Sequence, residues 1–185
     1  MPAPINLINQ QTIGASLGLD SLKKSLLAGL AGTLAIMVFM MLYYRARGVV
    51  ASLALIIYII LTAAIFKLFG ITMSLAGIAG FILSIGMAVD ANVLVFERVK
   101  EEVARGVTKA IALEEGFRRA WPSIRDSNVT TIISSLILYF LTSSFVRGFA
   151  LTLMIGVVAS MFSALTITRI IFRSFLRDEK VIIKN

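Results

Sequence analysis

Asp90 is the residue whose type and position most directly suggest chemistry. From Gly77 to Phe96 the run GIAGFILSIGMAVDANVLVF contains no other ionisable side chain. A charge at the centre of a lipid-spanning helix costs roughly 2.5–3.5 kcal/mol on insertion scales, and such acids usually face a polar interior and serve a function. We therefore interpret Asp90 as a carboxylate that gains and loses a proton. The alternative is a structural acid that holds helices together through an ion pair or a hydrogen bond.

The neighbours of Asp90 fall on different faces of the expected helix. Asn92 points nearly opposite, so we expect it to form an interhelical hydrogen bond rather than to share a proton with Asp90. Gly86 lies one turn before Asp90 and leaves room beside the carboxylate for water or a neighbouring side chain. The counter-charge stays open between Arg125, Arg147 and a partner subunit.

A second polar group opens a later apolar run. Its members are Arg125, Asp126, Ser127, Asn128, Thr130 and Thr131. A carboxylate at a helix start bonds free N–H groups and meets the positive end of the helix dipole, so Asp126 is a good N-cap. The functional alternative is a proton relay between Asp126 and Asp90. The supporting polar residues would then be Asn92, Arg125, Asn128, Thr130 and Thr131.

Composition excludes most kinds of enzyme site. Of the 185 residues, 58% are hydrophobic, mean hydropathy is +0.93, and there is no His or Cys. Zinc sites built on those residues, thiol catalysis, Ser-His pairs and disulfides are therefore excluded. No G-x-x-x-x-G-K-[ST] motif marks an ATP site. We expect a membrane protein that is not an enzyme, uses no cofactor or metal, and draws energy from a gradient or a partner.

Five apolar segments approach the length of about 20 residues that a membrane-crossing helix needs. The sequence therefore predicts an all-α membrane protein with five transmembrane helices. The expected spans are Ser25–Tyr44, Val49–Phe66, Met73–Phe96, Val129–Ser143 and Val146–Phe172.

The distribution of basic residues predicts the orientation of these spans. Of the 18 Lys and Arg residues, all but Lys23, Lys24, Lys67 and Arg147 fall on one side of the expected membrane. The excess marks that side as cytoplasmic, which places the amino terminus outside and the carboxyl terminus inside a plasma (inner) membrane. The net charge of +8 thus reflects topology and contact with the lipid bilayer rather than nucleic-acid binding.

We divide the chain into three regions. Residues 1–24 read as the remnant of a periplasmic segment and a lead-in to the membrane, because MPAPINLINQQ is too polar for a signal peptide. Asp20 or Ser21 is expected to cap the first helix. Residues 25–172 form the transmembrane domain, with a cytoplasmic loop at 97–125, and residues 173–185 form a cytoplasmic tail.

The loop at 97–125 is expected to be helical, because opposite charges recur at three- and four-residue spacing. Gly106 is the expected stop and Thr108 the next cap. A following amphipathic helix is expected to lie on the membrane surface and to end at Pro122. Its apolar face would contain Ala110, Leu113, Phe117, Ala120 and Trp121. The alternative is a solvated connector held by salt bridges.

Small residues recur at three- and four-residue spacing in two of the expected spans. In lipid, small side chains let helices approach closely, so these rows predict central helices that pack on others. The third span contributes Gly77, Gly80, Ser84, Ala88 and Ala91; the fifth contributes Gly148, Thr152, Gly156, Ser160 and Ser163. Gly86 is counted with the packing positions.

Three ordered motifs carry a family resemblance. The runs GMAVDANVLVFERVKEE, GFRRAWPSIRDSNVTT and GFALTLMIGVVASMFSALTITR resemble successive signatures of the SecD family of protein-export factors. The opening APINLINQQTIGASLGLDSL resembles the segment that leads from that family's periplasmic domain into its second helix. The resemblance covers nearly the whole chain.

The resemblance implies a fold, partners and a role. SecD belongs to the resistance-nodulation-division superfamily, pairs with a six-helix SecF bundle, and assists the SecYEG channel by using the proton-motive force. The chain would hold the second to sixth helices, while the family's first helix and the periplasmic region that grips the translocating polypeptide have no counterpart here. The acid of GMAVDAN is tied to proton conduction, a role that carries over to Asp90. Alternatives are a small-molecule or lipid exporter of the superfamily and a non-conducting translocon scaffold.

Overall fold

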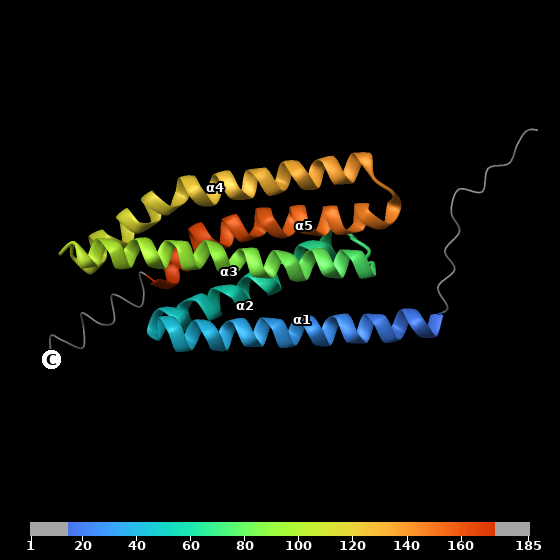
Figure 1. The fold of residues 1–185 in the computed structure, drawn as a ribbon, viewed down its shortest axis with the longest axis horizontal. Helices are drawn as coiled ribbons and strands as arrows, with labels where there is room; N and C mark the ends of the chain where they lie inside the picture. Colours follow the sequence, from blue (N-terminus) through green and yellow to red (C-terminus); the bar gives the residue numbers. More distant parts are fainter. Residues whose placement is uncertain (1–14, 173–185) are drawn as a thin grey trace, which may run out of the picture.

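The computed structural model describes residues 15–172, and this part of the chain is all-helical. Its helices are α1 (Ala15–Tyr44), α2 (Ala46–Leu68), α3 (Leu75–Ala104), α4 (Lys109–Leu141) and α5 (Ser144–Phe162). A π-helical segment, η1 (Ser163–Ile167), continues α5 into a last turn that reaches residue 172. The helices run alternately up and down in one elongated bundle (Figure 1). The predicted all-α fold is confirmed, and the expected tail at 173–185 lies outside the described residues.

Four of the described helices are long and apolar enough to cross a membrane. They are Gly18–Tyr44, Arg47–Leu68, Leu75–Ala104 and Ser144–Phe172. The expected fourth span, Val129–Ser143, overlaps the end of α4, which does not meet that criterion because polar residues interrupt its apolar sequence. The expected fourth and fifth spans are separated by a short break, since α4 ends at Leu141 and α5 begins at Ser144.

The first helix begins earlier than expected. Helix α1 runs through Asp20 and Ser21, so neither residue caps it, and the prediction of a cap there is wrong. Asp20 instead forms an ion pair with Lys24 one turn later, at 2.8 Å. This pairing of opposite charges at four-residue spacing supports the helix in a stretch that we had assigned to the lead-in.

The two rows of small residues form a close contact between α3 and α5. A Cβ atom added to Gly80 would lie 2.5 Å from the Phe149 carbonyl oxygen, and one added to Gly148 would lie 2.6 Å from the Ser74 hydroxyl. Side chains at these positions would therefore force the helices apart. Ser160, from the same row of α5, is also buried.

Hydrogen bonds cross this seam, by which we mean the contact along Gly77, Gly80, Ser84, Gly148, Thr152 and Gly156. The Thr152 hydroxyl donates to the Gly77 carbonyl oxygen at 2.8 Å. The buried Tyr58 hydroxyl of α2 lies 2.7 Å from the Ser84 hydroxyl and donates to the Gly156 carbonyl oxygen at 3.3 Å. Three helices are thus held by polar contacts that lie away from lipid.

The segment at 97–125 is helical, as predicted, but it contains no separate surface helix. Helix α3 continues to Ala104, and α4 begins after Thr108, with Gly106 in the left-handed region at φ +85°. Both expected boundaries, at Gly106 and Thr108, are confirmed. Pro122, however, lies inside α4, and Asp126 lies in its middle rather than at an N-cap. Those two predictions are wrong.

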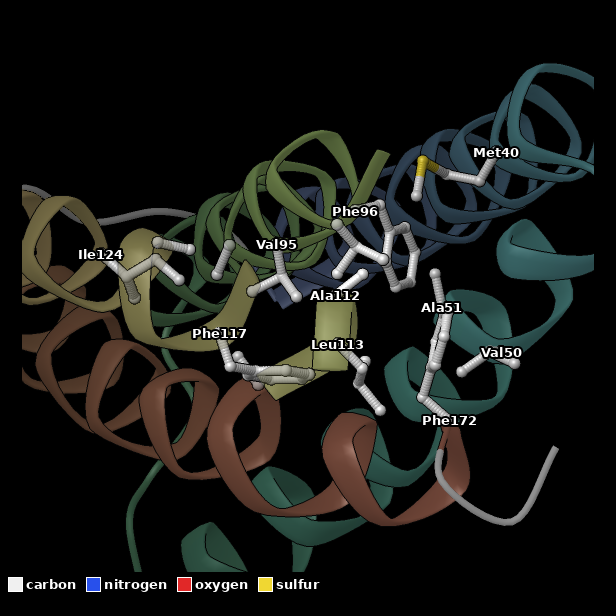
Figure 2. Packing of buried hydrophobic residues seen from close by; sticks show 14 residues of the cluster. Met40, Val50, Ala51, Val95, Phe96, Ala112, Leu113, Phe117, Ile124 and Phe172 are labelled. Carbon is white, nitrogen blue, oxygen red and sulfur yellow. The ribbon is translucent and has the colours of Figure 1, made fainter. Parts of the chain in front are cut away.

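The apolar face of this segment packs inside the protein rather than on the membrane surface. Leu113, Phe117 and Ala120 are buried, whereas Ala110 is exposed and Trp121 is half-buried. Figure 2 shows Leu113 and Phe117 gathered with Phe96 of α3. The buried row Leu113, Phe117, Ala120 and Ile124 passes through Pro122 without interruption, which explains why the helix continues.

Candidate functional site

Asp90 lies on the outward side of α3, at the mouth of a small pocket between α3 and α4. The residue is exposed in this chain. The pocket has a volume of about 90 Å³. Its described lining residues are Met87, Asp90, Ala91, Leu94, Ile124, Ser127, Asn128 and Thr131.

The register of the two helices explains why these residues meet. On each helix the four lining residues are spaced at i, i+3, i+4 and i+7, which places them on one face. Antiparallel packing of α3 and α4 lays the two faces side by side (Figure 1). We call this site the α3–α4 groove. Helix α3 supplies one acid and apolar side chains, while α4 supplies Ser127, Asn128 and Thr131.

Each polar group that α4 supplies donates one hydrogen bond to its own backbone. The Asn128 amide donates to the Ile124 carbonyl oxygen at 2.8 Å, and the Ser127 hydroxyl donates to the same oxygen at 3.1 Å. The Thr131 hydroxyl donates to the Ser127 carbonyl oxygen at 3.1 Å. Their side-chain oxygens stay available as acceptors. The groove can therefore accept hydrogen bonds from water or from a protonated carboxyl group.

Asp90 forms no ion pair or hydrogen bond with any of the residues that the structure describes. Every acid in the charged part of the bundle, by contrast, has a basic neighbour: Glu97, Glu101, Glu102, Glu114 and Glu115 pair with Lys or Arg. Asp90 thus differs from these acids in lacking a partner among the described residues.

Asp126 and its neighbours lie elsewhere on α4. The Asp126 carboxylate pairs with Arg125 at 2.8 Å, and both side chains are exposed. Thr130 donates to the Asp126 carbonyl oxygen at 2.8 Å. The groove lining does not include these three residues. The structure therefore brings Asn128 and Thr131 to Asp90, together with Ser127, but not Asp126, Arg125 or Thr130.

Asn92 faces the interior of the bundle. Its side-chain oxygen accepts a hydrogen bond from the Thr168 hydroxyl at 2.8 Å, and both residues are buried. Thr168 follows η1, so this bond ties α3 to the end of the last helix. The predicted interhelical bond of Asn92 is confirmed. Its partner was not predicted, because the π-helical segment that turns Thr168 inward leaves no sequence signal that we recognised.

Gly86 differs from the other glycines that we had grouped as packing positions. A Cβ atom added there would meet no heavy atom within 4 Å. The packing assignment of Gly86 is therefore wrong within this chain. The alternative expectation, open space one turn before Asp90, agrees with the structure.

Ion pairs between helices lock the charged end of the bundle and were not predicted. The buried Glu102 of α3 pairs with Arg119 of α4, and Arg105 adds a contact at 3.1 Å. Arg169, after η1, pairs with Glu114 of α4 and lies 5.9 Å from the centre of the Phe117 ring. The expected alternative of a salt-bridged connector thus describes this region better than a membrane-surface helix does.

Metal binding has no support in the described part of the chain, where no group of three or more acidic residues is placed to hold an ion. The geometry offers instead one acid in an apolar helix, facing outward, beside a polar row on the next helix. That arrangement can take up and release a proton, or pair with a cation from a neighbouring protein.

Known proteins with similar sequences share one description. Residues 2–178 match the family "Protein export membrane protein SecD/SecF, C-terminal". Similar proteins include the "Protein translocase subunit SecD" of Synechocystis, 53% identical over 91% of this chain and 36% of the relative. That of Thermobaculum terrenum is 50% identical over 95% of this chain and 35% of the relative. The chain thus spans about a third of the length of these relatives.

A solved structure has the same fold. The crystal structure of SecDF from Thermus thermophilus, described as a translocon-associated membrane protein, superposes with a TM-score of 0.86. It is 41% identical in sequence and covers 90% of this chain, which in turn covers 23% of that protein. A second SecDF structure, in a super-membrane-facing form, gives a TM-score of 0.80.

Proposed function

The chain belongs to the SecD/SecF C-terminal family of protein export membrane proteins, and we propose that it forms the membrane-embedded part of a SecD-type translocase subunit. In this proposal it assists export by using the proton-motive force. Its partners are a SecF-like six-helix bundle, the SecYEG channel and, through a periplasmic region, the translocating polypeptide. The names of the relatives support the export role, and the short coverage of their length makes the partners a proposal.

One observation supports Asp90 as the proton carrier. Asp90 is an acid in a helix that is apolar enough to span a membrane, it faces out of this chain, and no described residue neutralises it. A structural acid would be expected to have a partner within the bundle, as Glu102 has. A carrier needs an environment that changes, and an outward-facing groove allows a second bundle to bring a cation near and to remove it.

We also propose that α4 crosses the membrane, which gives five spans in an arrangement of the resistance-nodulation-division type. Helix α4 has 33 residues, or about 50 Å at 1.5 Å per residue, against a hydrocarbon core of roughly 30 Å. It lies alongside α3 and α5 over most of its length (Figure 1). Its polar residues Ser127, Asn128 and Thr131 line the α3–α4 groove rather than facing lipid.

The orientation follows from the charges. The end of the bundle that contains Arg45, Arg98 and Arg118 carries most of the basic residues, so we place it in the cytoplasm. The amino-terminal end of α1 is then outside. Residues 1–24 form the junction with a periplasmic region, 25–172 the membrane domain and 173–185 a cytoplasmic tail.

The proposal is tested with Asp90→Asn in a full-length SecD that contains this chain, assembled with its SecF-like partner. We expect export of a precursor into membrane vesicles to lose its stimulation by a proton gradient, while export without a gradient stays unchanged. Asp20→Asn is the matched control, because it makes the same chemical change at an exposed acid outside the groove. Gradient-driven export by Asp90→Asn at the wild-type rate would favour a non-conducting scaffold.

A further inference from the structure

A second pocket lies at the basic end of the bundle, where α1 turns into α2. Its volume is about 310 Å³, at the lower end of the roughly 300–1,000 Å³ of ligand pockets. The described lining residues are Tyr43, Tyr44, Arg45, Arg47 and Lys100. Three cationic side chains and two phenol groups thus surround one cavity, which we call the basic pocket. The proposed proton path does not use it.

The charges of the basic pocket are only partly neutralised. Lys100 pairs with Glu97 at 3.5 Å, and Glu97 also interacts with the Tyr44 hydroxyl. Neither Arg45 nor Arg47 forms an ion pair with any residue in the described range. The three cations therefore exceed the one neighbouring carboxylate by two charges. An arginine guanidinium is suited to bind phosphate oxygens through paired hydrogen bonds.

The backbone adds to this preference for an anion. Helix α2 begins at the basic pocket, and the side chain of its N-cap residue, Arg45, does not bond its first N–H groups. Free N–H groups at the start of a helix, together with its dipole, favour negative charge. The residue directly after the last residue of α1 is Arg45, and its backbone lies in the left-handed region, with φ at +50°.

The position of the basic pocket distinguishes a lipid headgroup from a soluble anion. It lies at the end of two helices apolar enough to span a membrane, and its wall is aromatic. The Tyr44 ring lies 6.0 Å from the Phe96 ring, and Tyr43 stacks on Phe39 at 5.8 Å. Tyrosine side chains and extended cationic side chains are enriched at the headgroup level of membranes.

An exposed apolar surface leads away from the basic pocket along α1. Phe39 is 60% exposed, Val38 53% and Leu42 77%. A soluble phosphate compound would leave this surface uncovered, whereas the acyl chains of a phospholipid would lie along it. The positive charge of the basic pocket, its position at the end of two membrane-type helices and the apolar surface beside it therefore all favour a ligand with an anionic headgroup and apolar chains.

We propose that the basic pocket binds the phosphate headgroup of an anionic phospholipid, with its acyl chains against α1. This binding goes beyond the proposed export function and does not depend on proton transfer by Asp90. It rests only on α1 and α2 lying in a membrane. Arg45 and Arg47 supply the main contacts, and Lys100 contributes from α3.

The test measures lipid affinity of the purified full chain in detergent by native mass spectrometry. Phosphatidylglycerol, phosphatidylcholine and inorganic phosphate are titrated separately. We expect phosphatidylglycerol to bind at least tenfold more tightly than phosphatidylcholine. Replacing two cations, R45Q together with R47Q, is expected to weaken phosphatidylglycerol binding by roughly 20- to 30-fold, on the scale of surface cations with anionic lipid.

Two further variants make the result specific. K109Q together with R118Q removes the same charge at the same end of the bundle but outside the pocket, and we expect less than a twofold change. R45K together with R47K keeps the charge but loses the paired hydrogen bonds of the guanidinium groups, so we expect its affinity for phosphatidylglycerol to lie between those of the wild type and the glutamine variant. Because this variant keeps the charge of the site, it also detects a general failure to fold after substitution at the turn.

Three results would overturn the proposal. The first is unchanged phosphatidylglycerol affinity in the R45Q and R47Q protein. The second is equal affinity for phosphatidylcholine, which would mean that the pocket does not select an anion. The third is binding of inorganic phosphate as tightly as phosphatidylglycerol, which would identify a soluble phosphate compound as the ligand.

Discussion

The two sides of α3 differ in how completely their polar groups find partners. On the side of α5, glycines bring the backbones together, and hydroxyl groups bridge the helices at Thr152–Gly77 and Tyr58–Ser84. On the side of α4, Asp90 has no partner within the described chain and opens onto a pocket of about 90 Å³. One helix thus combines a contact whose polar groups are paired with one whose acid has no described partner. In the function proposed above, the seam would hold α3 in place while the groove exchanges its occupant.

The largest expected difference in stability between the two sides comes from adding one methyl group to a glycine on each side. Gly80→Ala would place a Cβ atom 2.5 Å from the Phe149 carbonyl oxygen, and overpacking of this kind costs about 1–3 kcal/mol. Gly86→Ala meets open space and is expected to be neutral or stabilising by up to about 1 kcal/mol, the helix propensity difference. Unfolding in a denaturing detergent, followed by helical circular dichroism, measures both. Equal stability of the two variants would remove the distinction between seam and groove.

A smaller difference in stability is expected when one threonine on each side is replaced by valine. Thr152→Val removes the bond to the Gly77 carbonyl oxygen and is expected to cost about 0.6 kcal/mol, the average for hydrogen bonds between membrane helices, with an upper bound near 1.7 kcal/mol. Thr131→Val has the same change of shape but removes only a bond within α4, so its cost should be close to zero. The same unfolding titration compares them. A larger loss for Thr131→Val would show that the groove, too, holds the fold.

The smallest effect is expected at Asp126. Because its carboxylate is exposed, pairs with Arg125 and lies outside the groove lining, Asp126→Asn should change gradient-driven export by less than about twofold, given that exposed pairs contribute little. Export into vesicles from full-length protein provides the measurement. A loss as large as that of Asp90→Asn would instead assign Asp126 to the proton path and extend the groove along α4.

The sequence predicted local features better than the path of α4. The small-residue rows, Gly106, Thr108 and the interhelical bond of Asn92 each follow from spacing or backbone preference, so they could be predicted. Pro122 and Asp126 were misplaced because their local preferences favour a helix boundary. The row Leu113, Phe117, Ala120 and Ile124 overrides these preferences by burying one continuous face.

The surroundings of Asp90 could not be fully predicted from the sequence, because they depend on contacts between residues far apart in the chain. The separation of Asp90 from the small-residue row was visible in the helical period, and the polar cluster at 125–131 was a candidate neighbour, but which members of that cluster face Asp90 could not be predicted. Ser127, Asn128 and Thr131 face it only because α4 continues without a break and packs antiparallel to α3. The ion pair of Glu102 with Arg119, 17 residues apart, has the same origin.

Proton uptake by vesicles is the most direct test of the proposal that Asp90 carries protons. Full-length translocase that contains this chain, with its SecF-like partner, is reconstituted with an internal pH-sensitive dye, and an external acid pulse is applied during precursor export. If Asp90 carries protons, Asp90→Asn abolishes the export-linked proton uptake, while Asp20→Asn leaves it at the wild-type rate. Uptake by Asp90→Asn vesicles as fast as that of the wild type would contradict a proton-carrying role for the α3–α4 groove.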